Sequence, residues 1–184
     1  MKEQFNKLMS KTIWSAIILF CLRCFISWND IKNAFSIYDL FGYAGEAISL
    51  ATLLSITYER WLWKFNPLES TPVLSKKYTG SLISSYDNIE RNAELEIKQT
   101  LLTIQIILIT RESKSKSLSS TIDDVLGEKI LTYCYLNTPN ANVRDRSEIH
   151  YGTAMLCVDN PNKLTGQYFT DRKTIGDMKF NSAP

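Results

Sequence analysis

Two long apolar stretches near the N-terminus constrain this 184-residue chain more than any other feature. They occupy residues 13–28 and 40–58, and each contains a single charged residue. A helix of about 17–20 predominantly apolar residues spans the hydrocarbon core of a bilayer. The sequence therefore predicts a membrane hairpin of two transmembrane helices, at about 12–28 and 40–60.

A cleaved signal peptide and a pair of buried core helices are the alternatives for this region. The chain has the basic start of a signal peptide, but no small-x-small cleavage motif follows the first apolar stretch. A second apolar stretch comes directly after it, which a secreted protein would not need. Two adjacent helices of such uniform apolarity fit a membrane hairpin better than a soluble core.

Basic residues flank the two stretches on their outer sides. Lys2, Lys7 and Lys11 precede the first stretch, and Arg60 and Lys64 follow the second. Segments rich in Lys and Arg stay on the cytoplasmic side of a membrane. We therefore expect both termini, and the whole second half of the chain, in the cytoplasm.

The one charge in each apolar stretch is an arginine in the first and a glutamate in the second. Arg23 and Glu46 lie at similar distances from the link between the helices, so an antiparallel hairpin places them at similar depth. Charges at membrane depth are usually paired. The sequence predicts an Arg23–Glu46 pair, within one hairpin or between protomers; the alternative is a snorkelling arginine and a protonated glutamate. Small residues of the second stretch would allow close helix association in such an assembly: Gly42, Gly45, Ala47, Ser49 and Ala51.

The second half of the chain has the pattern of β-strands. Short runs of alternating apolar and polar residues recur about every ten residues, with turn residues between them. We predict a hairpin domain at 1–65 and an all-β domain at 66–184, an eight-stranded antiparallel β-barrel, with a two-sheet sandwich as the alternative. The candidate strands are 78–84, 94–99, 102–110, 116–123, 129–137, 148–158, 164–171 and 174–180.

One predicted strand carries a row of hydroxyl side chains at alternate positions. If this row faces inward it is suited to a polar ligand, and if it faces outward it is a solvated edge. Tyr133 and Tyr135 likewise share one face of the next strand. The row consists of Ser113, Ser115, Ser117, Ser119 and Thr121.

Charge and motif content exclude several function classes. Residues after Phe65 contain fourteen basic and fourteen acidic residues, so this half does not attract a nucleic-acid polymer, although a compact ligand with one or two phosphates remains possible. The chain has one histidine, His150, and no recognised catalytic or phosphate-loop motif. We expect no enzyme activity, no metal site and no cofactor. Cys21 and Cys24 fall within the first apolar stretch and are expected to pack there.

The order of these parts resembles a known family. Its members are the SMODS-associated two-transmembrane, β-strand-rich effectors of bacterial CBASS anti-phage immunity. The segments that carry the resemblance are IKQTLLTIQIILIT (97–110), S-x-S-x-S (113–117), LTYCYLNTP (131–139), HYGTAML (150–156) and LTGQYFTDR (164–172).

The resemblance implies a ligand-gated effector. The barrel would bind a cyclic dinucleotide made by a partner CD-NTase, and binding would promote homo-oligomerisation. The assembled hairpins would then disrupt the lipid bilayer of the bacterial inner membrane and cause abortive infection. A membrane-tethered barrel that carries an apolar ligand or binds a protein partner is the main alternative, and a hydrolase that works through His150 is a third hypothesis.

Strand parity and motif position select the candidate ligand-binding residues. Tyrosines would stack on the bases, Arg172 would bind a phosphate, and the remaining side chains would hydrogen-bond phosphates or base edges. Arg144 and Arg146 are a second candidate pair for phosphate. The predicted set is Gln99, Thr110, Ser113, Ser115, Ser117, Tyr133, Tyr135, Tyr151, Tyr168 and Arg172.

Overall fold

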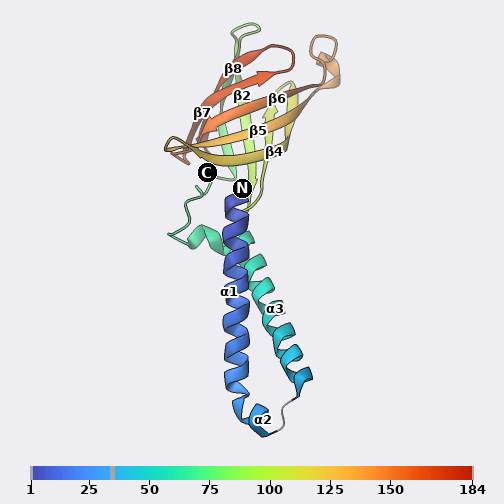
Figure 1. Ribbon diagram of the computed structural model, residues 1–184. Helices are drawn as coiled ribbons and strands as arrows, with labels where there is room; N and C mark the ends of the chain where they lie inside the picture. The colour runs from blue at the N-terminus through green and yellow to red at the C-terminus, as the bar shows by residue number, and fades with distance from the viewer. Residues whose placement is uncertain (1, 34–35, 184) are drawn as a thin grey trace. The chain divides into compact units, whose positions relative to one another are not determined.

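The computed structural model describes residues 2–33 and 36–183 (Figure 1). The chain divides into two compact units. Met1–Glu69 is helical, and Ser70–Pro184 is built of β-strands.

Two long helices dominate the first unit. α1 (Lys2–Ile26) and α3 (Ile37–Arg60) are joined through the short helix α2 (Trp28–Asn33), and the 3₁₀ helix η1 (Leu62–Phe65) follows. The segments Glu3–Ile26 and Ile37–Arg60 are each long and apolar enough to cross a membrane. The two predicted apolar helices are therefore present. α1 begins earlier than expected, because its polar first turns also favour a helix.

Small and hydroxyl side chains hold α1 against α3. Ala47 and Ala51 of α3 are buried, which lets the two backbones approach closely. The Oγ1 atom of Thr12 and the Oγ atom of Ser55 lie 2.6 Å apart in a hydrogen bond between the helices. The hairpin thus has a packed inner seam.

The outer faces of this hairpin are apolar and uncovered. Phe25 is 78% exposed, Ile26 is 76% exposed, and many other large apolar side chains of α1 and α3 are also exposed. A Cβ atom added at Gly42 or Gly45 would meet nothing within 4 Å. An apolar surface this extensive is rare on a water-soluble monomer and fits a lipid environment.

The second unit is a closed antiparallel barrel of eight strands. Each strand pairs with the next along the chain, and β1 pairs with β8 to close the barrel. The predicted eight-stranded antiparallel barrel is confirmed. The strands are β1 (Lys77–Ser84), β2 (Glu90–Gln99), β3 (Ile104–Thr110), β4 (Ser113–Val125), β5 (Glu128–Pro139), β6 (His150–Cys157), β7 (Lys163–Thr170) and β8 (Ile175–Ser182), with a 3₁₀ helix η2 (Ala141–Val143) after β5.

A register shift in β4 divides the predicted row of hydroxyls. The pairing of β4 with β5 is irregular between Ser117 and Ser119, where β4 contains one extra residue. A bulge of this kind reverses the alternation of side chains beyond it. Ser115 is buried before the shift, whereas Ser119 is exposed and Ser120 is buried after it. The prediction that all five hydroxyls share one face is therefore wrong.

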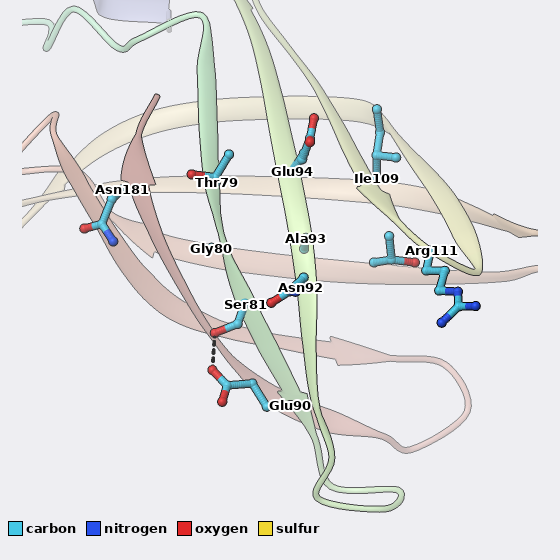
Figure 2. Close-up of a pocket in the computed structure, with 11 residues that line it drawn as sticks. Thr79, Gly80, Ser81, Glu90, Asn92, Ala93, Glu94, Ile109, Arg111 and Asn181 are labelled. Carbon is cyan, nitrogen blue, oxygen red and sulfur yellow. Dashed lines mark hydrogen bonds between the residues drawn. The ribbon is translucent and has the colours of Figure 1, made fainter. Parts of the chain in front are cut away.

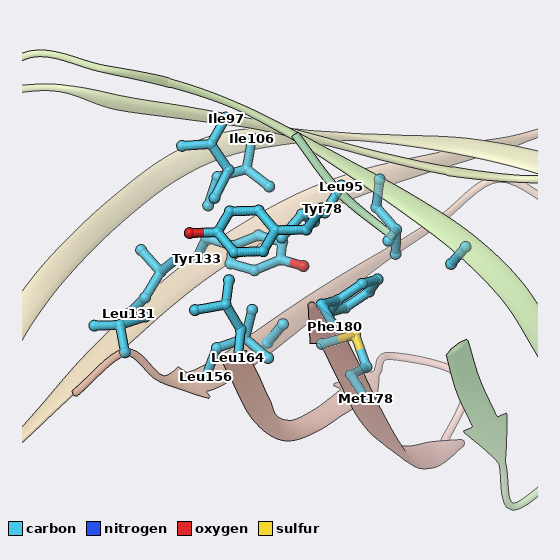
Figure 3. Packing of buried hydrophobic residues seen from close by; sticks show 14 of the residues in the cluster. Tyr78, Leu95, Ile97, Ile106, Leu131, Tyr133, Leu156, Leu164, Met178 and Phe180 are labelled. Atoms are coloured by element: carbon cyan, nitrogen blue, oxygen red, sulfur yellow. The ribbon is translucent and has the colours of Figure 1, made fainter. Parts of the chain in front are cut away.

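Apolar side chains pack together toward one end of the barrel interior (Figure 3). At this end the hydroxyl of Tyr78 donates to the carbonyl of Pro161 at 2.6 Å. The side chain of Gln99 accepts from the amide of Leu74 and donates to the carbonyl of Pro72, each at 2.9 Å. The bonds of Gln99 attach the segment before β1 to the filled end of the barrel. The main members of the core are Tyr78, Leu95, Ile97, Ile106, Leu131, Tyr133, Leu156, Leu164, Met178 and Phe180.

Candidate functional site

The opposite end of the barrel contains a cavity of about 380 Å³. This volume lies within the usual range for small-molecule sites. The cavity is bounded by the last residues of β1, β3, β5 and β7 and the first residues of β2, β4, β6 and β8, so closure of the barrel assembles it. Its lining includes Leu82, Ser84, Tyr86, Asp87, Arg91, Leu108, Thr110, Glu112, Ser113, Ser115, Tyr135, Asn137, Pro139, Val143, Arg146, Ser147, His150, Tyr168, Thr170, Arg172, Thr174 and Met178.

The inner part of the cavity combines apolar and polar side chains. Leu82, Leu108 and Met178 belong to the apolar core and also line the cavity. Beside them the buried Ser115 hydroxyl donates to the side-chain oxygen of Asn137 at 2.8 Å. An apolar surface with a few placed polar groups is typical of a site that binds and orients a small ligand.

Two tyrosine rings lie against glycines of the barrel wall. A Cβ atom at Gly152 would be 2.4 Å from Cζ of Tyr135, and one at Gly176 would be 2.4 Å from Cε1 of Tyr168. Only a residue without a side chain leaves room for a ring at this distance. Burial raises the pKa of Tyr135, so its phenol is neutral at physiological pH. The two glycines therefore leave room for two aromatic rings at the cavity.

An arginine–aspartate pair lies at the rim of the cavity. Nη1 of Arg91 donates to Oδ1 of Asp87 at 2.9 Å, and Nη2 of Arg91 contacts Oδ2. The hydrogen bonds from Arg91 and from the Ile89 amide lower the pKa of Asp87 to about 2. Asp87 is therefore ionised at physiological pH and holds the guanidinium in place.

Two more arginines line the same cavity. Nη2 of Arg146 lies 2.6 Å from Oε1 of Glu112, and Nη1 of Arg172 lies 3.5 Å from the Ser147 hydroxyl. Together with the pair at Arg91, the cavity contains three guanidinium groups and two carboxylates. This excess of positive charge suits a small anion, and guanidinium groups match the geometry of phosphate.

The single histidine also lines the cavity. Nδ1 of His150 lies 2.9 Å from the carbonyl oxygen of Glu148. Within residues 2–33 and 36–183, no hydroxyl side chain is hydrogen-bonded to His150. The same residues contain no group of three or more His, Cys, Asp or Glu side chains that could hold a metal ion.

The structure brings six of the ten predicted ligand-binding residues together at the cavity. The other four lie elsewhere: Gln99 is at the filled end, and the Ser117 hydroxyl accepts from the Ile106 amide at 2.9 Å. Tyr133 is fully buried, and Tyr151 is 58% exposed on the outer wall. The six cavity residues are Thr110, Ser113, Ser115, Tyr135, Tyr168 and Arg172. Of the second arginine pair, Arg146 lines the cavity, whereas Arg144 donates to the Pro139 carbonyl at 3.4 Å.

Sequence reasoning missed several cavity residues for which a signal existed. Arg91 has the same parity along β2 as the buried Ala93 and Leu95, and Asn137 continues the inward parity of Tyr135. Strand alternation alone could have found these two residues. Asp87 lies in the turn between β1 and β2, and barrel closure brings it to the rim.

The hairpin contains the predicted charge pair. Nε of Arg23 lies 2.9 Å from Oε2 of Glu46 in the same chain. The guanidinium also lies 4.4 Å from the ring centroid of Tyr43, a cation–π distance, and contacts the Ser27 hydroxyl. The pair is thus formed within one hairpin.

A second, open groove lies on the outer wall of the barrel over β8, β1, β2 and β3 (Figure 2). Its charged lining residues are Glu90, Glu94 and Arg111, and none of the described tyrosines lines it. The hydroxyl of Ser81 donates to Oε1 of Glu90 at 2.6 Å. Two carboxylates and one arginine make this groove less suitable for an anion than the cavity at the barrel end.

Comparisons with known proteins agree with this architecture. The family model described as "Cap15, cyclic dinucleotide receptor domain" matches residues 69–182, which include the whole barrel. The curated CD-NTase-associated protein 15 of Staphylococcus schleiferi is 31% identical over 183 residues, which cover 97% of both chains. The match therefore extends over the helical hairpin as well as the barrel. The chain belongs to the Cap15 family of CBASS-associated cyclic dinucleotide receptors.

Proposed function

We propose that the cavity at the barrel end binds a cyclic dinucleotide made by a partner CD-NTase, and that binding drives self-association of the hairpins. The assembled hairpins then disrupt the bacterial inner membrane and cause abortive infection. One observation carries the proposal: a cyclic dinucleotide receptor domain has tyrosines and arginines together at a single cavity.

The chemistry of the lining matches the two parts of such a ligand. Tyr135 and Tyr168 offer ring faces for stacking with bases, and every base has a π-face. Arg91, Arg146 and Arg172 offer planar donors for the two phosphates. An apolar ligand is disfavoured, because it would dehydrate the three guanidinium groups and offer them no hydrogen-bond acceptor.

The ion pairs at the rim explain how ligand binding could change the conformation of the barrel end. In the structure Asp87 and Glu112 hold Arg91 and Arg146. A phosphate group competes with these carboxylates for the guanidinium groups, so binding releases the turn after β1 and the turn after β3 from their present contacts. A ligand shifts an equilibrium only by its preference for one state, and this exchange of partners provides such a preference.

The hairpin provides the membrane-active part. The exposed apolar faces of α1 and α3 suit contact with lipid, and the distribution of Lys and Arg supports a cytoplasmic location of both termini. Arg23 and Glu46 lie within the apolar spans, where charges are costly and usually serve a function. We assign this pair to the association of hairpins.

The test is a thermal-melting screen of the full chain in detergent against cyclic dinucleotides that differ in base and linkage. At least one should raise the melting temperature, whereas the matching linear dinucleotides should not. The chain in lipid vesicles should then release a trapped dye when that compound is added. No stabilisation by any compound would contradict the ligand assignment, and stabilisation without dye release would contradict membrane disruption.

A further inference from the structure

The outer wall over β2, β3 and β4 carries a regular arrangement of charge. Glu94 pairs in register with Ile109, which pairs with Lys114. In the neighbouring row, Glu96 pairs with Ile107, which pairs with Lys116. The result is a column of two glutamates, a column of two isoleucines and a column of two lysines on adjacent strands.

All six side chains point away from the barrel interior. They alternate with the buried residues of their strands, and both lysines and Glu96 are exposed. Figure 2 shows Glu94 and Ile109 side by side on neighbouring strands of this outer wall. They lie at the edge of the open groove described above.

The glutamates and lysines of these columns do not form ion pairs with each other within one chain. Columns on β2 and β4 are two strand spacings apart, about 10 Å. Among the described residues, neither Lys114 nor Lys116 takes part in an ion pair, and Glu94 is paired through Oε2 with Lys77 at 2.7 Å. That pair is half-exposed, so it contributes little and leaves the second carboxylate oxygen available.

We propose that this face binds the same face of a second copy of the chain, about a twofold axis that runs along β3. Rotation about that axis places the glutamate column of one copy on the lysine column of the other. Ile107 and Ile109 then meet their own counterparts at the axis. The face is thus complementary to itself, as a twofold interface requires.

The direction of the axis also fits the position of the hairpin in the chain. A twofold axis along β3 keeps the strands of both barrels running in the same direction. Lys77, the first residue of β1, then lies at the same end of both copies, so the chain enters both barrels at that end. Two chains anchored in one membrane can form this contact without inversion of either copy.

The inference deepens the proposed function, because it names the surface through which receptor domains associate. A face centred on six side chains gives a weak contact in solution, below the size of a permanent interface. Anchoring in a membrane raises the effective concentration of the second copy. The contact therefore forms between copies that share one membrane or one detergent micelle.

Charge-exchange variants of the full chain test the face. One variant combines Glu94→Lys with Glu96→Lys, and the other combines Lys114→Glu with Lys116→Glu. Two differently tagged copies are produced together, extracted in mild detergent and purified through one tag, first without any cyclic dinucleotide. The fraction of the second tag recovered measures association, and the unchanged hairpins contribute equally in every combination.

Each variant paired with itself should co-purify at least about tenfold less than the natural chain, because like charges then face each other. The two different variants should co-purify with each other as well as the natural chains do. Equal recovery in all combinations, no recovery of the natural pair, or failure of the mixed pair would each overturn the proposal. The melting temperature of each variant, measured separately, checks that it folds. The ligand screen is independent of this result, so a failure of the face and a failure of the cyclic dinucleotide assignment are distinguishable.

Discussion

Asp87 and Arg91 form a two-point ion pair at the cavity rim, in which both guanidinium nitrogens Nη1 and Nη2 contact the carboxylate. The pair links the turn after β1 to the start of β2. The position of the turn therefore fixes the position of the Arg91 guanidinium, which we assign to phosphate binding.

Arg91→Gln should lower the affinity for the best-stabilising cyclic dinucleotide by about tenfold or more, because a charge-assisted bond to phosphate is lost. Isothermal titration of the full chain in detergent measures the change. Arg111→Gln is the matched control, since Arg111 lies on the outer wall, and its affinity should equal that of the natural chain. Equal affinities for both variants would show that Arg91 does not bind the ligand.

The Asp87–Arg91 pair should also give the protein a distinct acid response. Because the folded pKa of Asp87 is lowered to about 2 from the ordinary 3.8, the pair stabilises the fold above pH 3.8. This stabilisation is lost as the pH falls toward 2. Melting temperatures of the natural chain and Asp87→Asn should differ at pH 6 and converge toward pH 2. A constant difference over that range would contradict the assignment.

Tyr135→Ala should weaken ligand binding by roughly tenfold or more, through loss of a stacking surface, whereas Tyr135→Phe should retain binding. The same substitution at Tyr151, which is exposed on the outer wall, is the control. If Tyr151→Ala weakens binding as much as Tyr135→Ala does, the ligand lies outside the cavity.

Gly152→Ala should reduce affinity by displacing the Tyr135 ring, since the added Cβ would lie 2.4 Å from the ring. The effect should be smaller in a Tyr135→Ala background, where the added methyl group meets no ring and only the Phe169 carbonyl oxygen remains close, at 2.9 Å. A double-mutant cycle measured by isothermal titration checks this coupling. Additive losses would show that Gly152 acts on the ligand by another route.

Tyr133→Phe should raise the free energy of unfolding by about 1 kcal/mol, because the Tyr133 hydroxyl is buried and has no hydrogen-bond partner among the described residues. Ligand affinity should not change, since Tyr133 lies in the core rather than in the cavity lining. Thermal melting and isothermal titration give the two readouts. A loss of affinity would mean that the ligand reaches deeper than the cavity.

Strand parity predicted the cavity residues well where the alternation was regular. Tyr135 and Tyr168 keep the inward position expected of them, and both line the cavity. Parity did not indicate the position along the barrel axis, so Gln99 and Tyr133 were grouped with residues of the other end. Which end of the barrel is filled depends on core packing and on the segment that Gln99 binds. The alternation pattern of a single strand gives no information about either.

The bulge in β4 was also beyond reach from the sequence. Ser117 and Ser119 look equivalent by spacing, yet an extra residue between their pairing positions puts Ser119 outside. The irregularity exists only in the pairing with β5, where the partner strand sets the register.

The sequence by itself determined the two apolar helices and the number of strands, because apolar length and period-two alternation are local properties. It also predicted the pairing of Arg23 with Glu46, from their similar distances to the link between the helices. The tertiary structure decided which end of the barrel is hollow and brought Asp87, Arg91 and Arg146 to its rim. It also aligned Glu94, Ile109 and Lys114 in one row on the outer wall. These arrangements depend on closure and register, which join residues far apart in the chain and are fixed only when all eight strands pair.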